Sequence, residues 1–156
     1  GTGRYVWAPA TYLDGLLELP DEMGLSVIFI THDLGVVAEI ADEVVVMYLG
    51  KVVERADVYT LFEDPKHPYT RALLESIPRL GLEERHRLKA IRGMVPDPFA
   101  RPAGCPFHDR CDEFMPGVCD VIVPPTERLE GDRSVSCLLY SDVERLREET
   151  PEGADV

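Results

Sequence analysis

Four cysteines in the last third of the chain are the residues whose type and spacing most directly suggest chemistry. Five, seven and seventeen residues separate them, in the order Cys105, Cys111, Cys119 and Cys137. Structural zinc sites usually bring cysteines in close pairs, two to four residues apart, so these spacings fit zinc poorly. Iron–sulfur clusters accept wider spacings, since each thiolate reaches a different corner of the cluster. The residues favour a soft, thiolate-bound metal centre, and four free or buried thiols are the alternative.

A second candidate is His32, which follows the apolar run Val27-Ile28-Phe29-Ile30 directly after Thr31. A continuous apolar run suits a strand that is buried on both faces, as in a parallel sheet. Ligands of open α/β sheets bind at the carboxyl edge of the strands. A histidine there can donate a hydrogen bond to a phosphate or position a water molecule. The alternative is an ordinary polar residue at a strand-to-helix turn.

The elements that would position these residues follow from the pattern of apolar positions. The pattern predicts a buried strand at 25–30, a helix at 33–41, an antiparallel hairpin of 43–48 and 51–55, and short helices at 56–62, 69–76 and 138–148. Residues 11–19 begin a helical stripe that Pro20 interrupts. Residues 81–92 are expected to be partly helical, and residues 91–105 form a proline-rich, irregular loop. One buried strand alone does not complete a parallel sheet.

Composition narrows the possible partners. The net charge is −13, with 29 acidic residues against thirteen arginines and three lysines. Such a surface repels nucleic acid and anionic lipid. Acidic bias with little lysine also suits a halophilic source, a hypothesis that a melting temperature falling on addition of KCl would contradict. The sequence shows no secretory signal and no apolar run long enough to cross a bilayer. The four cysteines are therefore expected in a reducing compartment.

The residues around His32 resemble a known family. Gly24-Leu25, the run that ends at Asp33, and the stretch Val36-Val37-Ala38-Glu39-Ile40-Ala41-Asp42 resemble the switch-histidine segment of ABC-transporter ATP-binding subunits. The resemblance implies that His32 contacts the γ-phosphate of ATP, as both a catalytic and a nucleotide-binding residue. It also implies an α/β fold, namely the C-terminal part of a P-loop nucleotide-binding domain, with a cysteine-containing extension.

The extension resembles that of one branch of this family. His67-Pro68-Tyr69-Thr70, followed by Leu73-Leu74 and Ser76-Ile77-Pro78, is similar to the C-terminal extension of oligopeptide and dipeptide ABC ATPases. Gly104-Cys105-Pro106-Phe107 and Arg110-Cys111 resemble its cysteine segment, which in relatives is associated with a [4Fe–4S] cluster. The resemblance therefore implies Cys105, Cys111, Cys119 and Cys137 as cluster ligands, with zinc less favoured. His67 is interpreted as a structural anchor and His108 as a spectator.

The resemblance divides the chain into an irregular N-terminus (1–10), a partial nucleotide-binding domain (11–64), the extension (65–148) and an acidic tail (149–156). It implies a peptide importer in which permease subunits and a second ATP-binding subunit are the partners, with peptide contacted only indirectly and no nucleic acid. The subunit would be cytoplasmic, at the inner face of the cell membrane.

Several motifs that ATP hydrolysis requires are missing. No phosphate loop ending in Gly-Lys-Ser or Gly-Lys-Thr occurs, and neither the acidic Mg²⁺-binding strand nor the Ser-Gly-Gly signature is present. ATP with Mg²⁺ is therefore expected only in a complete subunit, and the chain alone is expected to be inactive. A truncated reading frame is one explanation. The alternatives are a stand-alone iron–sulfur or metal-binding regulatory module and a non-functional gene remnant.

Overall fold

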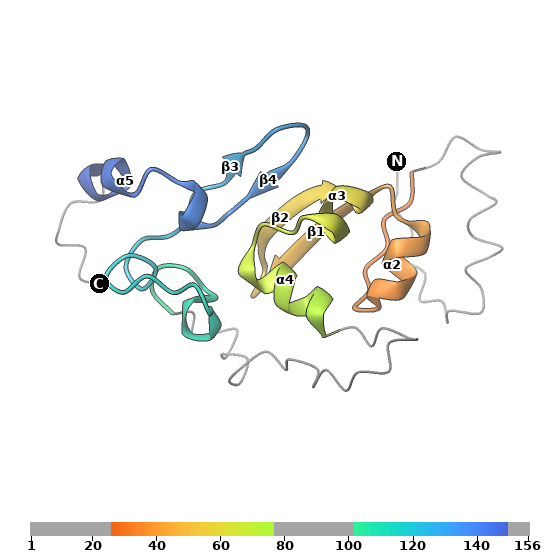
Figure 1. Ribbon diagram of the computed structural model, residues 1–156, viewed down its shortest axis with the longest axis horizontal. Helices are drawn as coiled ribbons and strands as arrows, with labels where there is room; N and C mark the ends of the chain where they lie inside the picture. The colour runs from red at the N-terminus through yellow and green to blue at the C-terminus, as the bar shows by residue number, and fades with distance from the viewer. Residues whose placement is uncertain (1–25, 77–101, 150–156) are drawn as a thin grey trace, which may run out of the picture. The chain divides into compact units, whose positions relative to one another are not determined.

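The computed structural model describes residues 26–76 and 102–149 (Figure 1). The chain divides into two compact units, Gly1–Ile40 and Ala41–Val156, and each is described by itself. Several expectations lie wholly or partly outside the described residues: the irregular N-terminus, the stripe that Pro20 interrupts, the first residue of the strand at 25–30, the helical stretch at 81–92, most of the loop at 91–105 and the acidic tail. The predicted boundary at residue 64 falls inside the second unit. Among the described residues, no helix has the length and apolar character that a bilayer crossing requires.

In the first unit the described residues form one helix, α2 (Leu34–Ile40). Its start is fixed locally by side chains. Asp33 Oδ1 accepts the backbone N–H groups of Gly35 at 3.0 Å and Val36 at 3.3 Å, and Thr31 Oγ1 accepts the N–H of Asp33 at 3.0 Å. Such caps satisfy backbone donors that the first turn leaves unpaired. The helix agrees with the prediction for residues 33–41.

The buried strand predicted at 25–30 is wrong for the residues that the structure describes. Residues 26–30 form no strand, and their side chains are exposed, with Ile28 at 89% and Ile30 at 92%. A parallel strand exists only where neighbouring strands supply its hydrogen-bond partners. The described part of the chain provides no such neighbour for this run, so its apolar residues have nothing to pack against.

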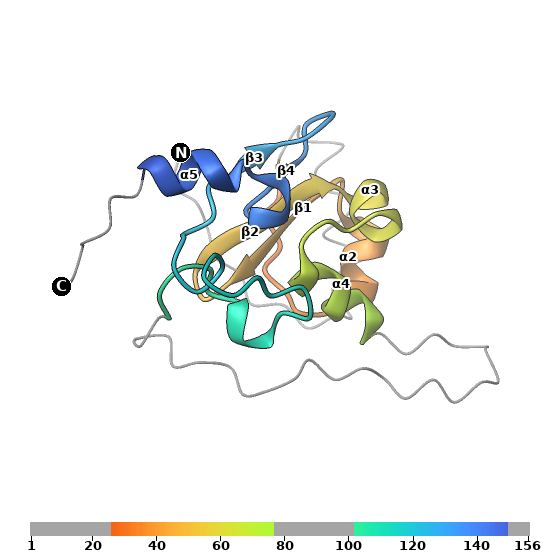
Figure 2. The same ribbon diagram turned by 60° about the vertical axis from the view of Figure 1, so that its left-hand side comes forward.

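The second unit is built on a four-stranded antiparallel sheet with the order β1-β2-β4-β3. Its strands are β1 (Glu43–Tyr48), β2 (Lys51–Asp57), β3 (Glu127–Arg128) and β4 (Ser134–Val135). The hairpin of β1 and β2 confirms the prediction. Its turn places Leu49 at φ 45° and Gly50 at φ 74°, the pair of positive φ values that two-residue hairpins of type I′ require. Figure 2 shows β3 and β4 extending the sheet beside β2.

A bulge interrupts the hairpin. Val46 lies opposite Glu54 but Met47 lies opposite Val52, so Val53 is the extra residue. A bulge changes the face of the sheet toward which the following side chains point. Here two successive residues, Val53 and Glu54, are both buried, at 4% and 0% exposure. Strict alternation would have placed one of them on the exposed face.

Short helices follow the hairpin and close the unit. They are α3 (Val58–Glu63), α4 (Pro68–Glu75), the 3₁₀ turns η2 (His108–Arg110) and η3 (Leu138–Tyr140), and α5 (Val143–Glu149). Asp57 caps α3 by accepting the N–H of Thr60 at 3.0 Å. The predicted helices at 56–62 and 69–76 correspond to α3 and α4. The one predicted at 138–148 is divided into η3 and α5.

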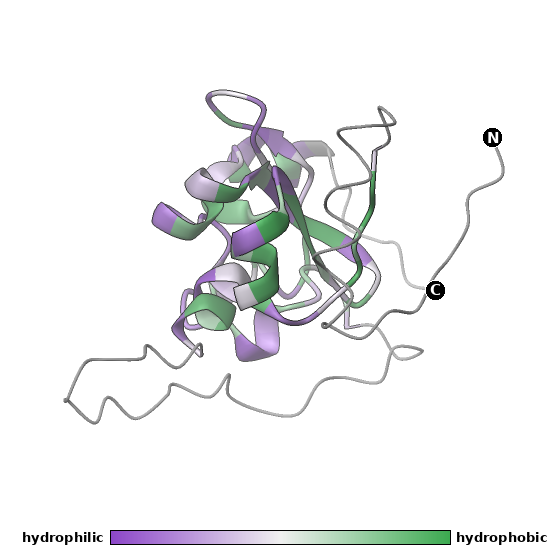
Figure 3. Ribbon diagram, turned by 90° about the vertical axis from the view of Figure 1, so that its right-hand side faces the viewer, coloured by the Kyte–Doolittle hydropathy of each residue, from purple (hydrophilic) through white to green (hydrophobic). Residues whose placement is uncertain are grey.

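The core of the second unit joins the hairpin to the cysteine segment, defined here as residues 102–122. Buried residues of the hairpin (Val46, Tyr48, Val53) and of the cysteine segment (Phe107, Ile122) belong to one cluster. The Tyr48 and Phe107 rings meet edge-on, with centroids 5.3 Å apart. By contrast, the loop between β3 and β4, at the top of Figure 3, is hydrophilic. The hairpin and the cysteine segment are therefore parts of one packed body.

Candidate functional site

The four cysteines line a single small pocket in the second unit. Its other lining side chains include His67, Phe107, His108 and Leu138. Cys105, Cys119 and Cys137 are buried and Cys111 is partly buried, and all four are free thiols. Cysteines that lie up to 32 positions apart in the sequence are thus brought together. The free volume between these side chains is about 10 Å³, about the space of one water molecule.

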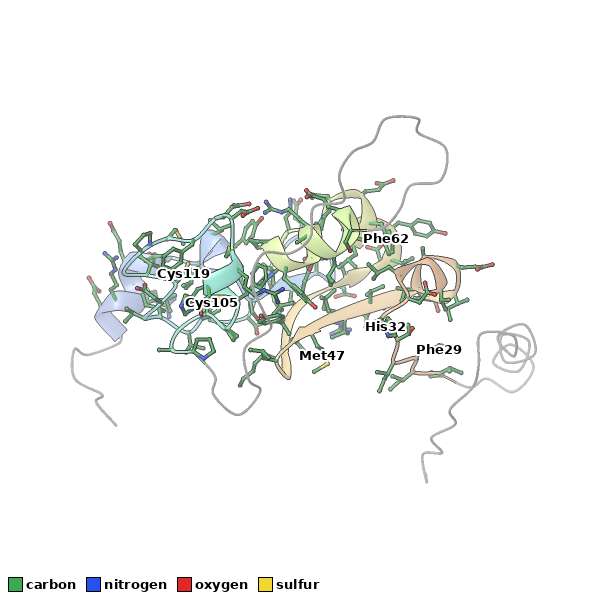
Figure 4. The ribbon with its side chains drawn as sticks, turned by 90° about the horizontal axis from the view of Figure 1, so that it is seen from below. Phe29, His32, Met47, Phe62, Cys105 and Cys119 are labelled. Carbon is green, nitrogen blue, oxygen red and sulfur yellow. The ribbon has the colours of Figure 1, made fainter. Side chains whose placement is uncertain are left out.

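Backbone hydrogen bonds hold the cysteine segment in its irregular course. The N–H of Cys105 donates to the carbonyl of Cys119 at 2.7 Å, and Figure 4 shows these two residues close together. The carbonyl of Cys105 accepts from the N–H of His108 at 3.1 Å, and the N–H of Cys111 donates to the carbonyl of His108 at 3.2 Å. Two of the sulfur-bearing residues are therefore placed by the short turn η2.

Gly104 permits the close approach of two stretches of this segment, one at Gly104 and Cys105 and one at Cys119. It has φ +68°, and a Cβ atom there would lie 2.4 Å from the carbonyl oxygen of Cys119. Only glycine combines a left-handed backbone with so close a neighbour. The pairing of Cys105 with Cys119 therefore depends on the residue before Cys105.

Burial keeps three of the thiols, those of Cys105, Cys111 and Cys137, protonated at neutral pH because it raises their pKa values. Burial raises the pKa of Cys105, raises that of Cys111 to about 11 and raises that of Cys137 to about 12. The neighbouring thiols add to the rise, since each would repel a second thiolate. A thiol in this state is a poor nucleophile. Metal binding would have to displace these protons.

The thiols do not converge on one point. Within residues 26–76 and 102–149, no group of three or more His, Cys, Asp or Glu side chains is arranged to hold a metal ion. The structure therefore brings the predicted ligands to one pocket without providing a finished single-ion site.

His108 also lines this pocket. Its Nδ1 lies 2.8 Å from the Cys105 carbonyl oxygen, and its Nε2 lies 3.0 Å from Asp109 Oδ1. Both ring nitrogens thus have oxygen atoms as partners. Arg110 donates to the Tyr48 hydroxyl at 3.3 Å, which connects η2 to the hairpin.

His67 is a pocket residue whose place the sequence only partly indicated. Its side chain is 1% exposed, and burial lowers its pKa to about 4. It caps α4, with Nδ1 accepting the N–H of Tyr69 at 3.0 Å. The prediction of a structural anchor agrees with this cap. Its place beside the cysteines was not foreseen, because 37 residues separate His67 from Cys105 in the sequence.

Glu54 and Arg133 form a buried ion pair that sequence reasoning missed. Glu54 accepts the N–H groups of Lys66 at 2.8 Å and His67 at 2.9 Å, and Arg133 Nη2 at 3.1 Å. Arg133 also bonds Asp64. The loop that leads into α4, and with it His67, is thus fixed to β2. A glutamate in an alternating strand gives no signal of burial, and the bulge that turns it inward leaves no mark in the sequence.

His32 lies in the first unit, between the exposed run and α2 (Figure 4). Its side chain is exposed, as are those of Thr31 and Asp33. The predicted position at the carboxyl end of a buried strand is therefore not found, whereas the predicted start of a helix just after it is.

Comparisons with known proteins find relatives that match most of the chain. The family described as the C-terminal region of oligopeptide/dipeptide transporters matches residues 53–119. A peptide import ATP-binding protein of Brucella ovis is 42% identical over 147 residues, which are 91% of this chain and 43% of that protein. The dipeptide transport ATP-binding protein DppF of Escherichia coli is 42% identical over 82% of this chain and 38% of its own length. The dipeptide transport ATP-binding protein DppD of Haemophilus influenzae is 41% identical over 136 residues, which are 87% of this chain and 40% of that protein.

The chain thus spans about two fifths of the length of these relatives. The comparisons give no support to a stand-alone regulatory module or to a gene remnant. The resemblance drawn from the residues around His32 and His67 is confirmed over most of the sequence. Residues 53–119 thus match the C-terminal region of the oligopeptide/dipeptide transporter family, and most of the chain is similar to peptide and dipeptide ATP-binding proteins.

Proposed function

We propose that this chain forms part of the ATP-binding subunit of an ABC-type peptide importer, namely the C-terminal part of its P-loop nucleotide-binding domain and the extension beyond it. The observation that carries the proposal is the identity of about 42% that extends over nine tenths of the chain to a peptide import ATP-binding protein. In the assembled transporter the partners are permease subunits and a second ATP-binding subunit at the inner face of the membrane. ATP and Mg²⁺ are held largely by motifs that this sequence does not contain.

His32 is the residue through which this chain would take part in hydrolysis. Its exposure and its place just before a capped helix leave the imidazole free to meet a nucleotide bound elsewhere in the subunit. There it would orient the γ-phosphate and the attacking water.

The His32→Ala variant of the complete subunit, assembled with its permease, is expected to lose at least about 100-fold in ATP turnover. The measurement is phosphate release in proteoliposomes. His86→Ala, a histidine outside the motif, is the control and is expected to retain turnover. Unchanged turnover in the His32 variant would refute the catalytic role.

The second part of the proposal concerns the cysteine pocket, which would hold a [4Fe–4S] cluster with Cys105, Cys111, Cys119 and Cys137 as ligands. The donor set supports it, because four thiols that lie far apart in the sequence line one pocket. Four-iron clusters take one thiolate at each iron. The free volume of about 10 Å³ is too small for a cluster, so binding would require the four cysteine side chains to move apart.

Anaerobic reconstitution of the chain with ferrous iron and sulfide tests this assignment. The wild-type chain is expected to turn brown, with thiolate-to-iron charge-transfer absorbance and four irons per chain. Cys111→Ser is expected to lose most of this absorbance, because a serine hydroxyl is a poor ligand for a soft metal. Asp112→Asn, at the adjacent exposed position, is the matched control. If the wild-type chain stays colourless and binds one zinc ion, the site is a zinc site and not a cluster site. If it binds neither iron nor zinc, the metal assignment is overturned.

A further inference from the structure

β1 lies at the end of its sheet and has one open edge. The strand order β1-β2-β4-β3 gives β1 a partner on one side, and within residues 26–76 and 102–149 no strand pairs with its other side. A strand forms hydrogen bonds alternately to its two sides, so about half of the N–H and C=O groups of β1 point away from β2. With six residues, β1 is long enough to pair with another strand along this edge.

The features that usually prevent pairing at such an edge are missing from β1. Natural edge strands often carry lysine, proline or a bulge. β1 contains neither lysine nor proline, and the extra residue of the hairpin bulge, Val53, belongs to β2. Its one charged residue, Glu43, is bound to Arg55 across the hairpin at 2.7 Å. The open edge of β1 can therefore accept a strand.

The face of the hairpin that turns away from the core is also apolar. Val45 is 46% exposed, Met47 is 55% exposed and Val52 is 41% exposed. Val45 and Met47 are alternate residues of β1, and Met47 lies opposite Val52, so the three side chains share one face. Figure 4 shows Met47 on the side of the hairpin opposite Phe62 of α3. These three residues are called the hairpin face below.

The sequence of β1 is typical of a strand that is buried on both faces. Residues 44–47 are four apolar residues in succession. An antiparallel sheet with one face in water alternates apolar and polar residues, whereas a continuous apolar run is typical of a strand that is covered on both sides. In the first unit, residues 27–30 are a second apolar run with exposed side chains. Each run is therefore expected to pack against a part of the protein that the described residues do not provide.

The comparisons indicate which part of the protein this is. The chain covers 43% of the Brucella ovis relative and 38% of DppF of Escherichia coli, and the family that matches residues 53–119 is described as a C-terminal region. About three fifths of each relative thus have no counterpart in this chain. A second copy of the chain is a poorer occupant, because pairing would bring together two chains that each have a net charge of −13.

We propose that the open edge of β1 and the hairpin face bind the part of the ATP-binding subunit that precedes this chain in its relatives. An apolar strand of that part pairs with β1, and apolar side chains of the same part cover Val45, Met47 and Val52. The inference rests on the proposed function and adds to it the surface at which the two parts of the subunit join. One continuous sheet then extends from the preceding part through β1 and β2 to β4 and β3.

Amide hydrogen exchange, followed by mass spectrometry, tests the open edge. It compares the chain alone with a joined protein, in which the preceding three fifths of the Brucella ovis relative are fused to the N-terminus of the chain. In the chain alone, about half of the β1 amides are expected to exchange rapidly. In the joined protein their exchange is expected to be at least about 100-fold slower, because they gain hydrogen-bond partners. Glu54 and Arg55, which pair with both β1 and β4, are the internal control and are expected to change little.

Met47→Lys tests the hairpin face. In the chain alone it is expected to change the melting temperature by less than about 2 °C, because Met47 is exposed. In the joined protein it is expected to lower the melting temperature by at least about 5 °C, because an unpaired lysine would be buried. Val123→Lys is the matched control, since Val123 is an apolar residue outside the hairpin with 68% exposure. It is expected to have little effect in either protein.

The possible outcomes separate this inference from the proposed function. β1 amides that are already protected in the chain alone, or that exchange equally fast in both proteins, overturn the inference. A chain that sediments as a dimer, and as a monomer after Met47→Lys, also overturns it, because a second copy then occupies the surface. ATP turnover that depends on His32, combined with an unprotected β1, overturns this inference alone. A protected β1 without such turnover supports the inference and overturns the proposed function.

Discussion

Arg133→Met is expected to lower the free energy of unfolding by about 3–5 kcal/mol, because it leaves a buried carboxylate without its counter-ion. Glu54 has no exposed surface, and Arg133 is 8% exposed. In the variant, Glu54 keeps only the two backbone donors of Lys66 and His67. Urea unfolding followed by circular dichroism measures the loss, and the melting temperature is expected to fall by on the order of 10 °C.

Two further variants identify the cause. Arg55→Met removes an ion pair of similar length, 2.7 Å to Glu43, whose side chains are 51% and 45% exposed, and it is expected to have little effect. Adding Glu54→Gln to Arg133→Met removes the uncompensated charge and keeps an oxygen acceptor. The double variant should therefore recover part of the lost stability. If it is as unstable as Arg133→Met alone, lost packing and not the buried charge explains the effect.

Gly104→Ala is expected to lower the free energy of unfolding by at least about 3 kcal/mol. It is also expected to abolish iron binding at the cysteine pocket. The new Cβ would lie 2.4 Å from the carbonyl oxygen of Cys119, 2.7 Å from the carbonyl carbon of Asp120 and 2.8 Å from the N of Val121. All three are backbone atoms, which cannot rotate away. The stretch that holds Gly104 and Cys105 must move away from the stretch at Cys119, and the hydrogen bond from Cys105 to Cys119 is lost.

Gly117→Ala is a matched control for this substitution. Gly117 has φ +72°, close to that of Gly104, but a Cβ there meets nothing within 4 Å. It therefore carries only the cost of a left-handed backbone, about 1–2 kcal/mol. Thermal unfolding and iron content of both variants check the expectation. Equal losses in the two would show that conformation alone, and not the contact with Cys119, decides the stability of the segment.

The local elements of the second unit could be predicted from the sequence because their signals are local. The strand at 43–48 has the bounds of β1, since its apolar residues and the glycine of the turn mark both ends. The helix at 69–76 begins one residue early, at Pro68, because His67 supplies the cap. The prediction of a strand at 25–30 was wrong for the opposite reason. Such a strand requires neighbouring strands as hydrogen-bond partners, and no local sequence pattern shows whether they are present.

Of the residues that line the cysteine pocket, only the four cysteines could be predicted from the sequence to lie together. Cysteine is rare enough for four residues to be singled out by type, and the structure gathers them at one pocket. The position of His67 beside them depends on packing between α4 and the cysteine segment. Glu54 was missed because burial of a charged residue in β2 follows from a one-residue bulge. Periodicity, read residue by residue, cannot register such a shift.

The order of strands in the sheet has a consequence for how the chain folds as it is made. β2 receives its second neighbour from β4, and the pair Glu54–Arg133 spans 79 residues. At a synthesis rate of about 5–20 residues per second, roughly 4–16 s pass between the appearance of these two residues. For that time the hairpin has an open edge, and a lone hairpin is only marginally stable. The nascent chain thus carries an unpaired strand and an uncompensated glutamate until its last strands emerge, and this interval is when it is most exposed to aggregation.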